Sequence, residues 1–387
     1  MKARLTEVAI DGFTSMGEKT SLKLGPLTML IGANGAGKSN FMLFFRMLNY
    51  MMSGSLQSFI GTFGGAGSLL HLGAKRTQTC GGRVVFETND GINSYEFRLA
   101  HARPDRLIFT DEALDFQGHA KKLRREPLVL DAGHTETALL RPENREKKIC
   151  KVFHQCLSGF RFFQFHDTSD ASALRGYTDV AENNYLRADG RNLAAILLRL
   201  QQQFPQEYVR IVHTLKLVAP FFEDFILTPQ VSRDSSSNAV AEQGAARGCP
   251  LLLRWRGKEP DYEYGVHQLS DGTLRFIALT TLLLLPAALR PKASFIDEPE
   301  LGLHPKALSV LAGMLRSASA EMQILCSTQS PTLLDHFAAD EVVVVEREDG
   351  NSTLRRLREQ DLATWKDDYS LGEMWTMNLV GGRPARE

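Results

Sequence analysis

The sequence predicts an α/β fold, in which a mixed β-sheet with helices carries an antiparallel β subdomain and a helical insertion. The first observation is a continuous apolar run at 27–31, followed by a glycine-rich turn and a helical pattern at 40–52. An unbroken apolar run of this length is typical of a strand buried on both faces. The second is a series of alternating patterns that indicates antiparallel strands at 83–86, 94–99 and 106–110. The third is a pair of helical patterns within 193–218.

The elements of the N-terminal part follow from local patterns. Alternation and apolar runs predict strands at 5–10, 22–24 and 27–31, and then the helix at 40–52. The glycine-rich stretch at 61–73 predicts a loop or a broken helix end. Asn89-Asp90-Gly91 predicts a hairpin turn, because these residue types accept the backbone angles of tight turns.

The stretch 121–151 is charged and helical in tone. It predicts a solvated helix face, and the alternative is a patch that binds nucleic acid. Its basic residues are Lys121, Lys122, Arg124, Arg125, Arg145, Lys147, Lys148 and Lys151.

Two helices are expected in the insertion. Asp189 or Gly190 is the expected cap of the first, and Pro205 ends it. The apolar face of this helix consists of Leu193, Ile196, Leu197 and Leu200. The second helix, at 208–218, is closed by Pro220. Residues 232–248 are rich in Ser, Ala and Gly and predict a mobile loop, after which strand signals resume at 251–255.

Composition gives a chain with ample apolar material for a large core and no net charge. Of 387 residues 43% are hydrophobic, and 45 Lys+Arg balance 45 Asp+Glu, so total charge gives no attraction to nucleic acid or an anionic membrane. The most apolar run, 276–289, contains Pro286 and is shorter than the ~20 residues of a membrane-spanning helix, so it predicts a buried core helix. The N-terminus lacks a signal-peptide core, and five cysteines without a Cys-x-x-Cys predict free thiols in a reducing cytoplasm.

The first motif that carries chemistry is Gly32-Ala33-Asn34-Gly35-Ala36-Gly37-Lys38-Ser39, which fits the P-loop pattern G-x-x-x-x-G-K-[ST] in full. Its glycines let several main-chain N–H groups point at one phosphate chain, and the following helix adds its positive end. Lys38 supplies charge to the β and γ phosphates of ATP, and the Ser39 hydroxyl is a Mg²⁺ ligand. The position between a buried strand and a helix is the context that such a loop requires.

The second motif is a short hydrophobic strand that ends in two carboxylates, at 293–299. Successive side chains of a strand point to opposite faces, so Asp297 and Glu298 are expected to divide their work. Asp297 would hold the Mg²⁺ shell, and Glu298 would orient or deprotonate the attacking water.

The third motif, Leu269-Ser270-Asp271-Gly272-Thr273, runs straight into an apolar helix at 274–285. Ser270 at a helix start is first of all an N-cap. The same geometry also makes an anion site, so the capping and phosphate-binding interpretations are compatible.

Together the three motifs resemble the ABC-type ATPase head of the RecF/SMC-like group, and in particular the stand-alone bacterial AAA-like ATPases encoded near phage-defence or toxin genes. Leu269-Ser270-Asp271-Gly272 is similar to the signature motif of that group, and Asp297-Glu298-Pro299-Glu300 with Leu301-Gly302-Leu303-His304-Pro305 resembles its Walker B motif and D-loop. Further similar stretches are Ile10-Asp11-Gly12-Phe13, 165–169, 186–193 and Gly381-Gly382-Arg383-Pro384. The resemblance implies an ATPase lobe I at 1–168, a helical insertion with the mobile loop at 169–249, and a lobe II with signature, Walker B and switch at 250–387.

The resemblance also implies a mechanism. Two heads face each other as a homodimer or higher oligomer, and each ATP lies between the P-loop of one head and the signature of the other. The implied ATP-binding residues are Asn34, Gly35, Ala36, Gly37, Lys38, Ser39, Asn40, Ser270, Asp271, Gly272 and Gln164. The implied Mg²⁺ ligands are Ser39, Asp297 and Gln164, and the implied catalytic residues are Glu298 and Gln329.

One of these assignments departs from the family pattern, and another has two interpretations. The switch position usually holds His, whereas Ser327-Thr328-Gln329-Ser330-Pro331 places a Gln there, which carries no charge and predicts slow turnover. Gln164 is either the Q-loop glutamine or a half-buried strand residue, and both interpretations stand.

The leading hypothesis for function is an ATPase that regulates or powers a nearby-encoded effector, such as a nuclease or toxin, in antiviral defence. The alternative is a RecF/SMC-like DNA-repair ATPase that clamps DNA, with salt-sensitive binding. A transporter subunit and a nearly inert ATP sensor are two further interpretations.

Overall fold

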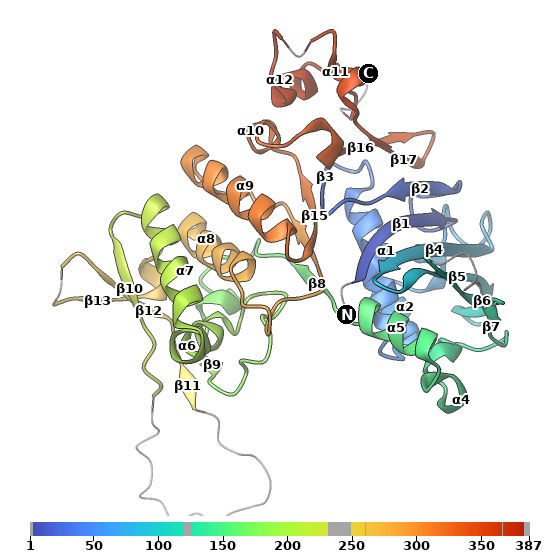
Figure 1. The fold of residues 1–387 in the computed structure, drawn as a ribbon, viewed down its shortest axis with the longest axis horizontal. Coiled ribbons are helices and arrows are strands. Elements are labelled where there is room, and N and C mark those ends of the chain that lie inside the picture. The colour runs from blue at the N-terminus through green and yellow to red at the C-terminus, as the bar shows by residue number, and fades with distance from the viewer. Residues whose placement is uncertain (1–2, 120–125, 231–248, 260, 366, 383–387) are drawn as a thin grey trace, which may run out of the picture. The chain divides into compact units, whose positions relative to one another are not determined.

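The computed structural model describes residues 3–119, 126–230, 249–259, 261–365 and 367–382. They group into two compact units, each assembled from separate stretches of chain (Figure 1). Unit 1 comprises Met1–Phe162, Pro291–Phe295 and Ser319–Glu387, and unit 2 comprises Phe163–Arg290 and Ile296–Ala318. The predicted division at 1–168, 169–249 and 250–387 stays a prediction, because it follows motifs and not compactness.

Unit 1 contains an antiparallel sheet built mainly from the N-terminal third of the chain. Its strand order is β2 (Thr20–Lys23), β1 (Ala3–Asp11), β4 (Thr79–Thr88), β5 (Gly91–Ala102), β6 (Arg106–Gly118) and β7 (Leu128–Val129). The pairing of β4 with β5 closes at Thr88 opposite Gly91, which confirms the predicted hairpin. The predicted antiparallel series is confirmed as well.

A mixed sheet completes the β structure of unit 1. Its strand order is β17 (Asn351–Arg356), β16 (Val342–Glu348), β3 (Leu27–Ile31), β15 (Gln323–Thr328), β14 (Ala293–Asp297) and β8 (Phe160–Phe163). Both β15 and β16 run parallel to β3, and every residue of β3 is buried. The unbroken apolar run is thus confirmed as a central strand, with the predicted bounds.

Helix α1 (Lys38–Met51) packs against both sheets of unit 1. The ring of Phe44 stacks on Phe97 of β5 at 6.1 Å, and Phe45 lies 4.9 Å from Phe295 of β14, measured between ring centroids. Burial of each such ring contributes about 1.5–3 kcal/mol. The helix begins at Lys38 and not at the predicted Asn40, because Gly37 takes a left-handed φ of 115° and ends the loop there.

Short helices surround this core. They are α2 (Leu56–Thr62), α3 (Ala66–Leu69), α4 (Pro142–Arg145), α5 (Lys148–Leu157), α10 (Pro331–Leu334), α11 (Glu359–Leu362) and α12 (Leu371–Thr376). The glycine-rich stretch forms α2 and α3, which confirms the broken helix end as against a plain loop.

The helical prediction at 121–151 is confirmed only in part, at α4 and α5. Residues 120–125, with Lys121, Lys122, Arg124 and Arg125, lie outside the described residues. Strand β7, an irregular stretch, α4 and α5 follow. The buried carboxylate of Glu112 holds the irregular stretch, since it accepts hydrogen bonds from the main-chain N–H of Ala138 at 2.9 Å and from the hydroxyl of Thr137. A contact of this kind leaves no local pattern in the sequence.

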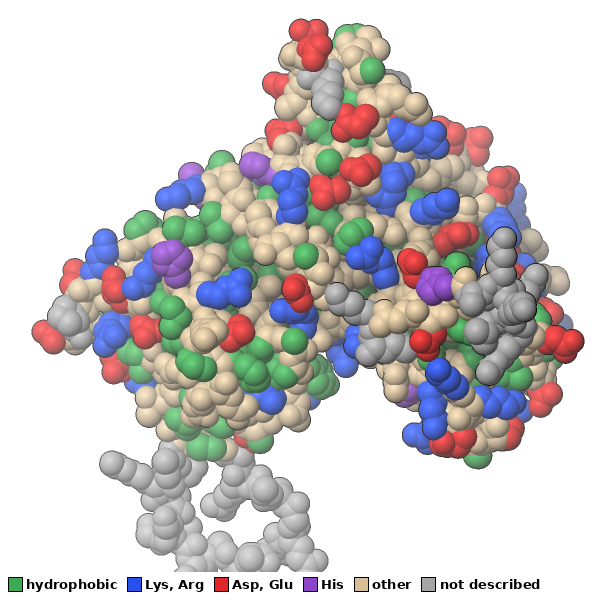
Figure 2. Space-filling view, viewed as in Figure 1, with side chains coloured by type: hydrophobic (Ala, Val, Ile, Leu, Met, Phe, Trp, Pro, Cys, Tyr) green, Lys and Arg blue, Asp and Glu red, His purple; other side chains and the backbone are tan. Residues whose placement is uncertain are grey.

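Three of the described basic residues of this stretch have polar partners. Lys148 lies 3.2 Å from Asp90, Lys151 lies 2.6 Å from Glu146, and Lys147 donates to Asn144 at 2.8 Å. On the visible face, Lys and Arg side chains are interspersed with Asp and Glu (Figure 2). These pairs favour the solvated-face interpretation over a patch that binds nucleic acid.

Unit 2 is a helical unit with small sheets. Its helices are α6 (Leu193–Gln203), α7 (Pro205–Val218), α8 (Asp271–Leu283) and α9 (Pro305–Ser319). Its strands are β9 (Thr178–Asp179), β10 (Phe222–Ile226), β11 (Pro250–Leu251), β12 (Arg254–Gly257) and β13 (Glu263–Gly265). Helix α7 contacts both α6 and α8, and α8 is buried at every residue from Leu274 to Leu283.

Several predicted boundaries in unit 2 are corrected. Asn192, and not Asp189 or Gly190, is the N-cap of α6, and Pro205 already belongs to α7, whose first turn needs no N–H from it. The strand expected at 251–255 is split between β11 and β12. Helix α8 ends at Leu283, short of the predicted 285 and 289, because Pro286 follows. The predicted loop at 232–248 lies outside the described residues, and among those described no helix is both long and apolar enough to cross a bilayer.

Candidate functional site

The P-loop of unit 1 leaves the carboxyl end of β3 and enters α1. At Gly32 a Cβ atom would lie 2.3 Å from the carbonyl oxygen of Val345 on β16, so only glycine fits beside that strand. At Gly37, where φ is 115°, a Cβ would lie 2.2 Å from Oγ of Ser352. The loop is therefore a tight backbone cradle whose two outer glycines have steric reasons.

Lys38 lies beneath this loop. Its side chain is only 6% exposed, and Nζ donates to the carbonyl oxygens of Gly32 at 2.6 Å and Ala33 at 3.0 Å. Ser352 Oγ donates to the carbonyl of Ala36 at 2.6 Å, and Arg347 donates to that of Gly35 at 3.3 Å. The carbonyl oxygens of four loop residues thus each accept a hydrogen bond from a side chain. The N–H groups of Ala33 and Ala36 donate within the protein, so an anion would be bound by other N–H groups of the loop.

The electrostatics at the start of α1 suit a bound phosphate. Its first turn contains no acidic residue, and no side chain caps it. Asn34, Gly35 and Ser39 are exposed, and the amide of Asn40 donates to Ser15 Oγ at 2.9 Å. A helix N-terminus with a lysine fits a triphosphate, and an exposed Ser39 hydroxyl fits a Mg²⁺ ligand.

Gln329 belongs to the same end of the same sheet. Strand β15 pairs with β3 in parallel, with Thr328 opposite Ile31, so Gln329 and Gly32 each follow directly after their strand. Unit 1 thereby brings the predicted switch residue to the sheet edge that carries the P-loop. Its predicted role in turnover stays a prediction.

The two Walker B carboxylates follow Phe295 and belong to unit 2. Asp297 is the last residue of β14, and Glu298 lies beyond the strand with a left-handed φ of 42°. A non-glycine residue in this region costs about 1 kcal/mol or more and is held only by its surroundings. Because Glu298 lies beyond the strand, the expected alternation of strand faces does not apply to it, and the predicted division of work between the two carboxylates stays a prediction.

Gln164 connects to Walker B through a histidine. Gln164 is exposed and lies one residue beyond β8, so its interpretation as a half-buried strand residue is wrong. Its Nε2 lies 3.3 Å from Nδ1 of His166, whose Nε2 lies 3.0 Å from the carbonyl oxygen of Asp297. Gln164 is thus linked to Asp297 through His166, and its predicted identity as the Q-loop glutamine and its contact with Mg²⁺ stay predictions.

Arg275 joins three functional segments of unit 2. It extends from α8 and donates to the carbonyl oxygens of Phe165 at 2.7 Å, His166 at 2.9 Å and Leu301. Burial lowers the pKa of its guanidinium below the ordinary value, an effect that the charge of Asp271 partly offsets. The signature helix, the segment after β8 and the D-loop are therefore held by one side chain.

The signature helix and the D-loop also touch directly. A Cβ at Gly272 would lie 2.4 Å from the carbonyl oxygen of Gly302, where φ is 73°. The signature glycine thus has a packing reason that is independent of phosphate binding.

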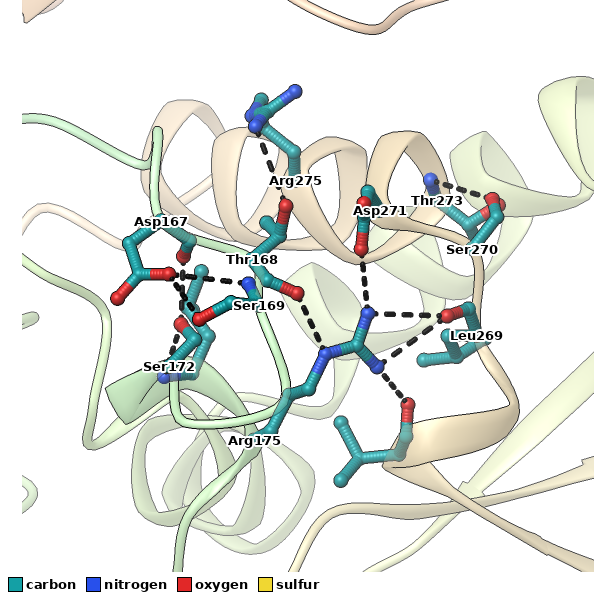
Figure 3. A network of polar contacts seen from close by, with 12 residues as sticks. Asp167, Thr168, Ser169, Ser172, Arg175, Leu269, Ser270, Asp271, Thr273 and Arg275 are labelled. Carbon is teal, nitrogen blue, oxygen red and sulfur yellow. Dashed lines mark hydrogen bonds and ion pairs between the residues drawn. The ribbon is translucent and has the colours of Figure 1, made fainter.

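The signature loop is held by a second buried arginine, Arg175 (Figure 3). It donates to the carbonyl oxygens of Thr168 and Val266 at 2.8 Å each, to Leu269 at 3.3 Å and to Asp271 Oδ1 at 2.7 Å.

At the start of α8, Ser270 Oγ accepts the N–H of Thr273 at 3.2 Å, which confirms the predicted N-cap. The carboxylate of Asp271 is paired with Arg175. A phosphate at this turn would therefore be bound by the main-chain N–H groups and not by the side chain of Asp271.

Sequence reasoning missed Arg175, Arg275 and His166 as positioning residues. Arg275 could have been found, since it is the lone charge inside the apolar helix pattern at 274–285. Arg175 leaves no such signal, because its partners are main-chain carbonyls more than 90 positions away in part. Each unit thus assembles its own predicted residues: the P-loop and Gln329 in unit 1, and Gln164, Asp297, Glu298 and the signature in unit 2.

These features agree with comparisons to known proteins. Residues 27–335 match a family model described as "AAA domain, putative AbiEii toxin, Type IV TA system". The chain belongs to this AAA family. A relative of this AAA chain is "Old nuclease" of Escherichia phage P2, 23% identical over 397 positions that cover 92% of the chain and 61% of the relative. The chain therefore spans about three fifths of the length of that curated relative.

Solved structures show the same fold. The SMC head bound to the C-winged helix domain of ScpA has a TM-score of 0.59 at 14% identity, covering 93% of this chain and 99% of that one. The SMC head with an extended coiled coil bound to the C-terminal domain of ScpA, from Pyrococcus furiosus, has a TM-score of 0.54 at 13% identity, covering 95% and 99%. The predicted family is confirmed by the family model, and the predicted fold is confirmed by the solved structures.

Proposed function

We propose that this AAA chain is a Mg²⁺-dependent ATPase whose ATP-bound heads pair with each other, and whose cycle regulates or powers an effector protein in anti-phage defence. The observation that carries the proposal is the P-loop, in which Lys38 lies beneath a glycine cradle at the start of α1. This arrangement concentrates positive charge and N–H donors where a triphosphate would lie.

The residues of the two units have separate roles in this proposal. Lys38 and the loop amides hold the β and γ phosphates, while Ser39, Asp297 and Gln164 hold Mg²⁺. When bound, Mg²⁺ neutralises charge on the phosphate oxygens.

Glu298 acts on the attacking water. The water oxygen bonds to the γ-phosphorus, the bond from that phosphorus to the bridging oxygen breaks, and Glu298 accepts the proton. Gln329 orients the water or the γ-phosphate by hydrogen bonding alone. Since Gln329 cannot carry positive charge, slow turnover is expected.

The second head would complete the site. In the proposed sandwich, Ser270 and Gly272 of the partner's signature face the γ-phosphate, and the N-terminal end of the partner's α8 adds to its stabilisation. Loss of the γ-phosphate then loosens the pair, so that the nucleotide state is converted into subunit geometry.

The defence role rests on the family and on one relative. The family description names a toxin of a Type IV TA system, and the curated relative is a phage nuclease. Among the described residues no group of three or more His, Cys, Asp or Glu side chains is placed to hold a metal ion, so the proposal assigns the destructive step to a separate effector.

Phosphate release tests the enzyme. Lys38→Ala should lower turnover about 100-fold or more, since it removes a donor to the transferred group, and Glu298→Gln should lower it by about 10²–10⁴. Lys23→Ala is the matched control, because it removes an exposed lysine of unit 1. Turnover that survives Lys38→Ala would refute the ATPase assignment.

Sedimentation tests the pairing of heads. Glu298→Gln with Mg·ATP should sediment as a dimer or larger assembly, because it binds ATP and does not release it. Ser270→Arg in the same background should remain monomeric, since a bulky cation replaces the expected phosphate contact. A Glu298→Gln chain that stays monomeric with ATP would refute the sandwich.

Plating of phage on cells that carry the chain with its neighbouring genes tests the defence role. The unmodified locus should reduce plaque formation, and Lys38→Ala should remove the protection while Lys23→Ala keeps it. Protection that persists with Lys38→Ala would show that ATP is not needed for defence.

A further inference from the structure

The C-terminal part of the described chain returns to the P-loop. The carbonyl oxygen of Gly382 accepts a hydrogen bond from the main-chain N–H of Ala33 at 2.7 Å. Ala33 is the second residue of the P-loop, and its own carbonyl already accepts from Lys38 Nζ at 3.0 Å. Both main-chain polar groups of Ala33 are therefore held, the carbonyl by the lysine and the N–H by a residue 349 positions later in the sequence (382 − 33).

Glycine is required at this contact for two reasons. Gly381 and Gly382 have left-handed φ angles of 80° and 84°. A Cβ at Gly382 would lie 2.8 Å from Cγ1 of Val344 and 3.6 Å from Cα of Gly32, and one at Gly381 would lie 2.4 Å from Oε1 of Glu346. Any other residue would thus push the segment away from the loop.

The glycine pair is itself held by strands that flank the site. Glu346 Oε1, on β16, accepts the N–H of Gly382 at 2.9 Å. Arg355, on β17, donates to the carbonyl oxygen of Val380 at 2.7 Å, and the Val380 side chain is buried. The segment is therefore docked by named contacts with β16 and β17, which lie on the same side of β3.

The same segment is anchored beside the switch. Helix α12 packs on α10, which begins two positions after Gln329 at Pro331. The N–H of Gly372 donates to Asp335 Oδ1 at 2.6 Å, and a Cβ at Gly372 would lie 2.3 Å from the carbonyl oxygen of Pro331. The chain from α12 to Gly382 thus spans from the switch segment to the P-loop within unit 1.

We propose that residues 370–382, here called the C-terminal strap, belong to the nucleotide site, with the carbonyl of Gly382 as a positioning group for the P-loop. This rests on the proposed function and adds the residues that set nucleotide affinity. Without the hydrogen bond to Ala33, the loop must be ordered when the triphosphate binds, and that ordering weakens binding.

Isothermal titration with Mg·ATP compares four variants with the unmodified chain. Glu346→Ala removes the acceptor that holds Gly382, and Glu346→Gln keeps an acceptor oxygen at that position. Gly382→Ala introduces the Cβ that meets Val344. Gly133→Ala is the matched control, because Gly133 also has a left-handed φ of 86° but has no atom within 4 Å of the added Cβ.

Dissociation constants should rise about five- to tenfold for Glu346→Ala and Gly382→Ala, the size expected for one lost hydrogen bond. Glu346→Gln and Gly133→Ala should stay within about twofold. Hydrogen exchange at the Ala33 amide, measured without nucleotide, should be faster in the first two variants only, which separates loop positioning from general instability.

Each outcome decides a separate point. If the unmodified chain binds no Mg·ATP, the proposed function fails and the strap has no nucleotide to position. If it binds ATP and the two strap variants bind equally well, the strap proposal fails while the ATPase stands. Unchanged exchange at Ala33 in Gly382→Ala would likewise overturn the strap.

Discussion

Arg175→Met is expected to destabilise unit 2 and stop turnover, although Arg175 is not proposed to touch ATP. The substitution removes a guanidinium that is 5% exposed and serves four acceptors. The Asp271 side chain is 65% exposed, so solvent replaces that contact at little cost. The carbonyl oxygens of Thr168, Val266 and Leu269 are left without this donor, and we expect a cost of about 3 kcal/mol in the free energy of unfolding.

Urea denaturation of unit 2 measures this cost. Of the three tryptophans, only Trp255 lies in unit 2, so its fluorescence reports that unit once Trp365 and Trp375 are phenylalanine. Arg191→Met is the control, because that side chain is 52% exposed and 4.0 Å from its partner carboxylate, and it should cost about 0.5 kcal/mol or less. An Arg175→Met chain that matches the control in stability, or that keeps normal turnover, would refute the reasoning.

Three further predictions concern unit 1 and the thiols. Gly37→Ala should abolish ATP binding in calorimetry, because its Cβ would lie 2.2 Å from Ser352 Oγ; retained micromolar binding would contradict this. With a thiol reagent at pH 8, exposed Cys249 should react at once, and Cys80 and Cys156 should react only on unfolding. The reason is that burial raises the pKa of Cys80 to about 12 and that of Cys156 to about 11. A fast phase that persists after Cys249→Ser would contradict this prediction. The free energy of unfolding should fall by up to about 1.4 kcal/mol per thiol per pH unit above pH 9. Above that pH the buried thiols of the folded chain keep protons that the same thiols release in the unfolded chain. A urea midpoint that is flat from pH 8 to 10.5 would contradict this expectation.

Local sequence patterns predicted the elements whose surroundings in the fold are reflected in their own residues. Residues 27–31 form a strand with the predicted bounds because burial on both faces requires an unbroken apolar run. Within the charged stretch at 121–151, the irregular part around 137–138 was not predicted, because it is held by Glu112, a buried carboxylate on a different strand. A tertiary hydrogen bond of this kind leaves no local pattern.

The candidate site divides in the same way. The P-loop, the two carboxylates and the signature are contiguous motifs, because each lies at a single strand end or helix start. The residues that position these motifs were not predicted from the sequence. Gln164 was predicted only as one of two alternatives, a Q-loop glutamine or a half-buried strand residue. Arg175, Arg275 and Gly382 act on main-chain atoms of distant residues, and a carbonyl oxygen has no residue identity that a sequence could display.

The three contacts of Arg275 have a consequence for the coupling of ATP hydrolysis between two paired heads. Arg275 belongs to the signature helix and donates to both the segment after β8 and the D-loop, so these three segments cannot shift separately. In the proposed pair of heads, these joined segments would respond to their own nucleotide through Asp297 and to the partner's nucleotide through Ser270. The two ATP molecules would then be hydrolysed together, and one inactive head would stop hydrolysis in the other.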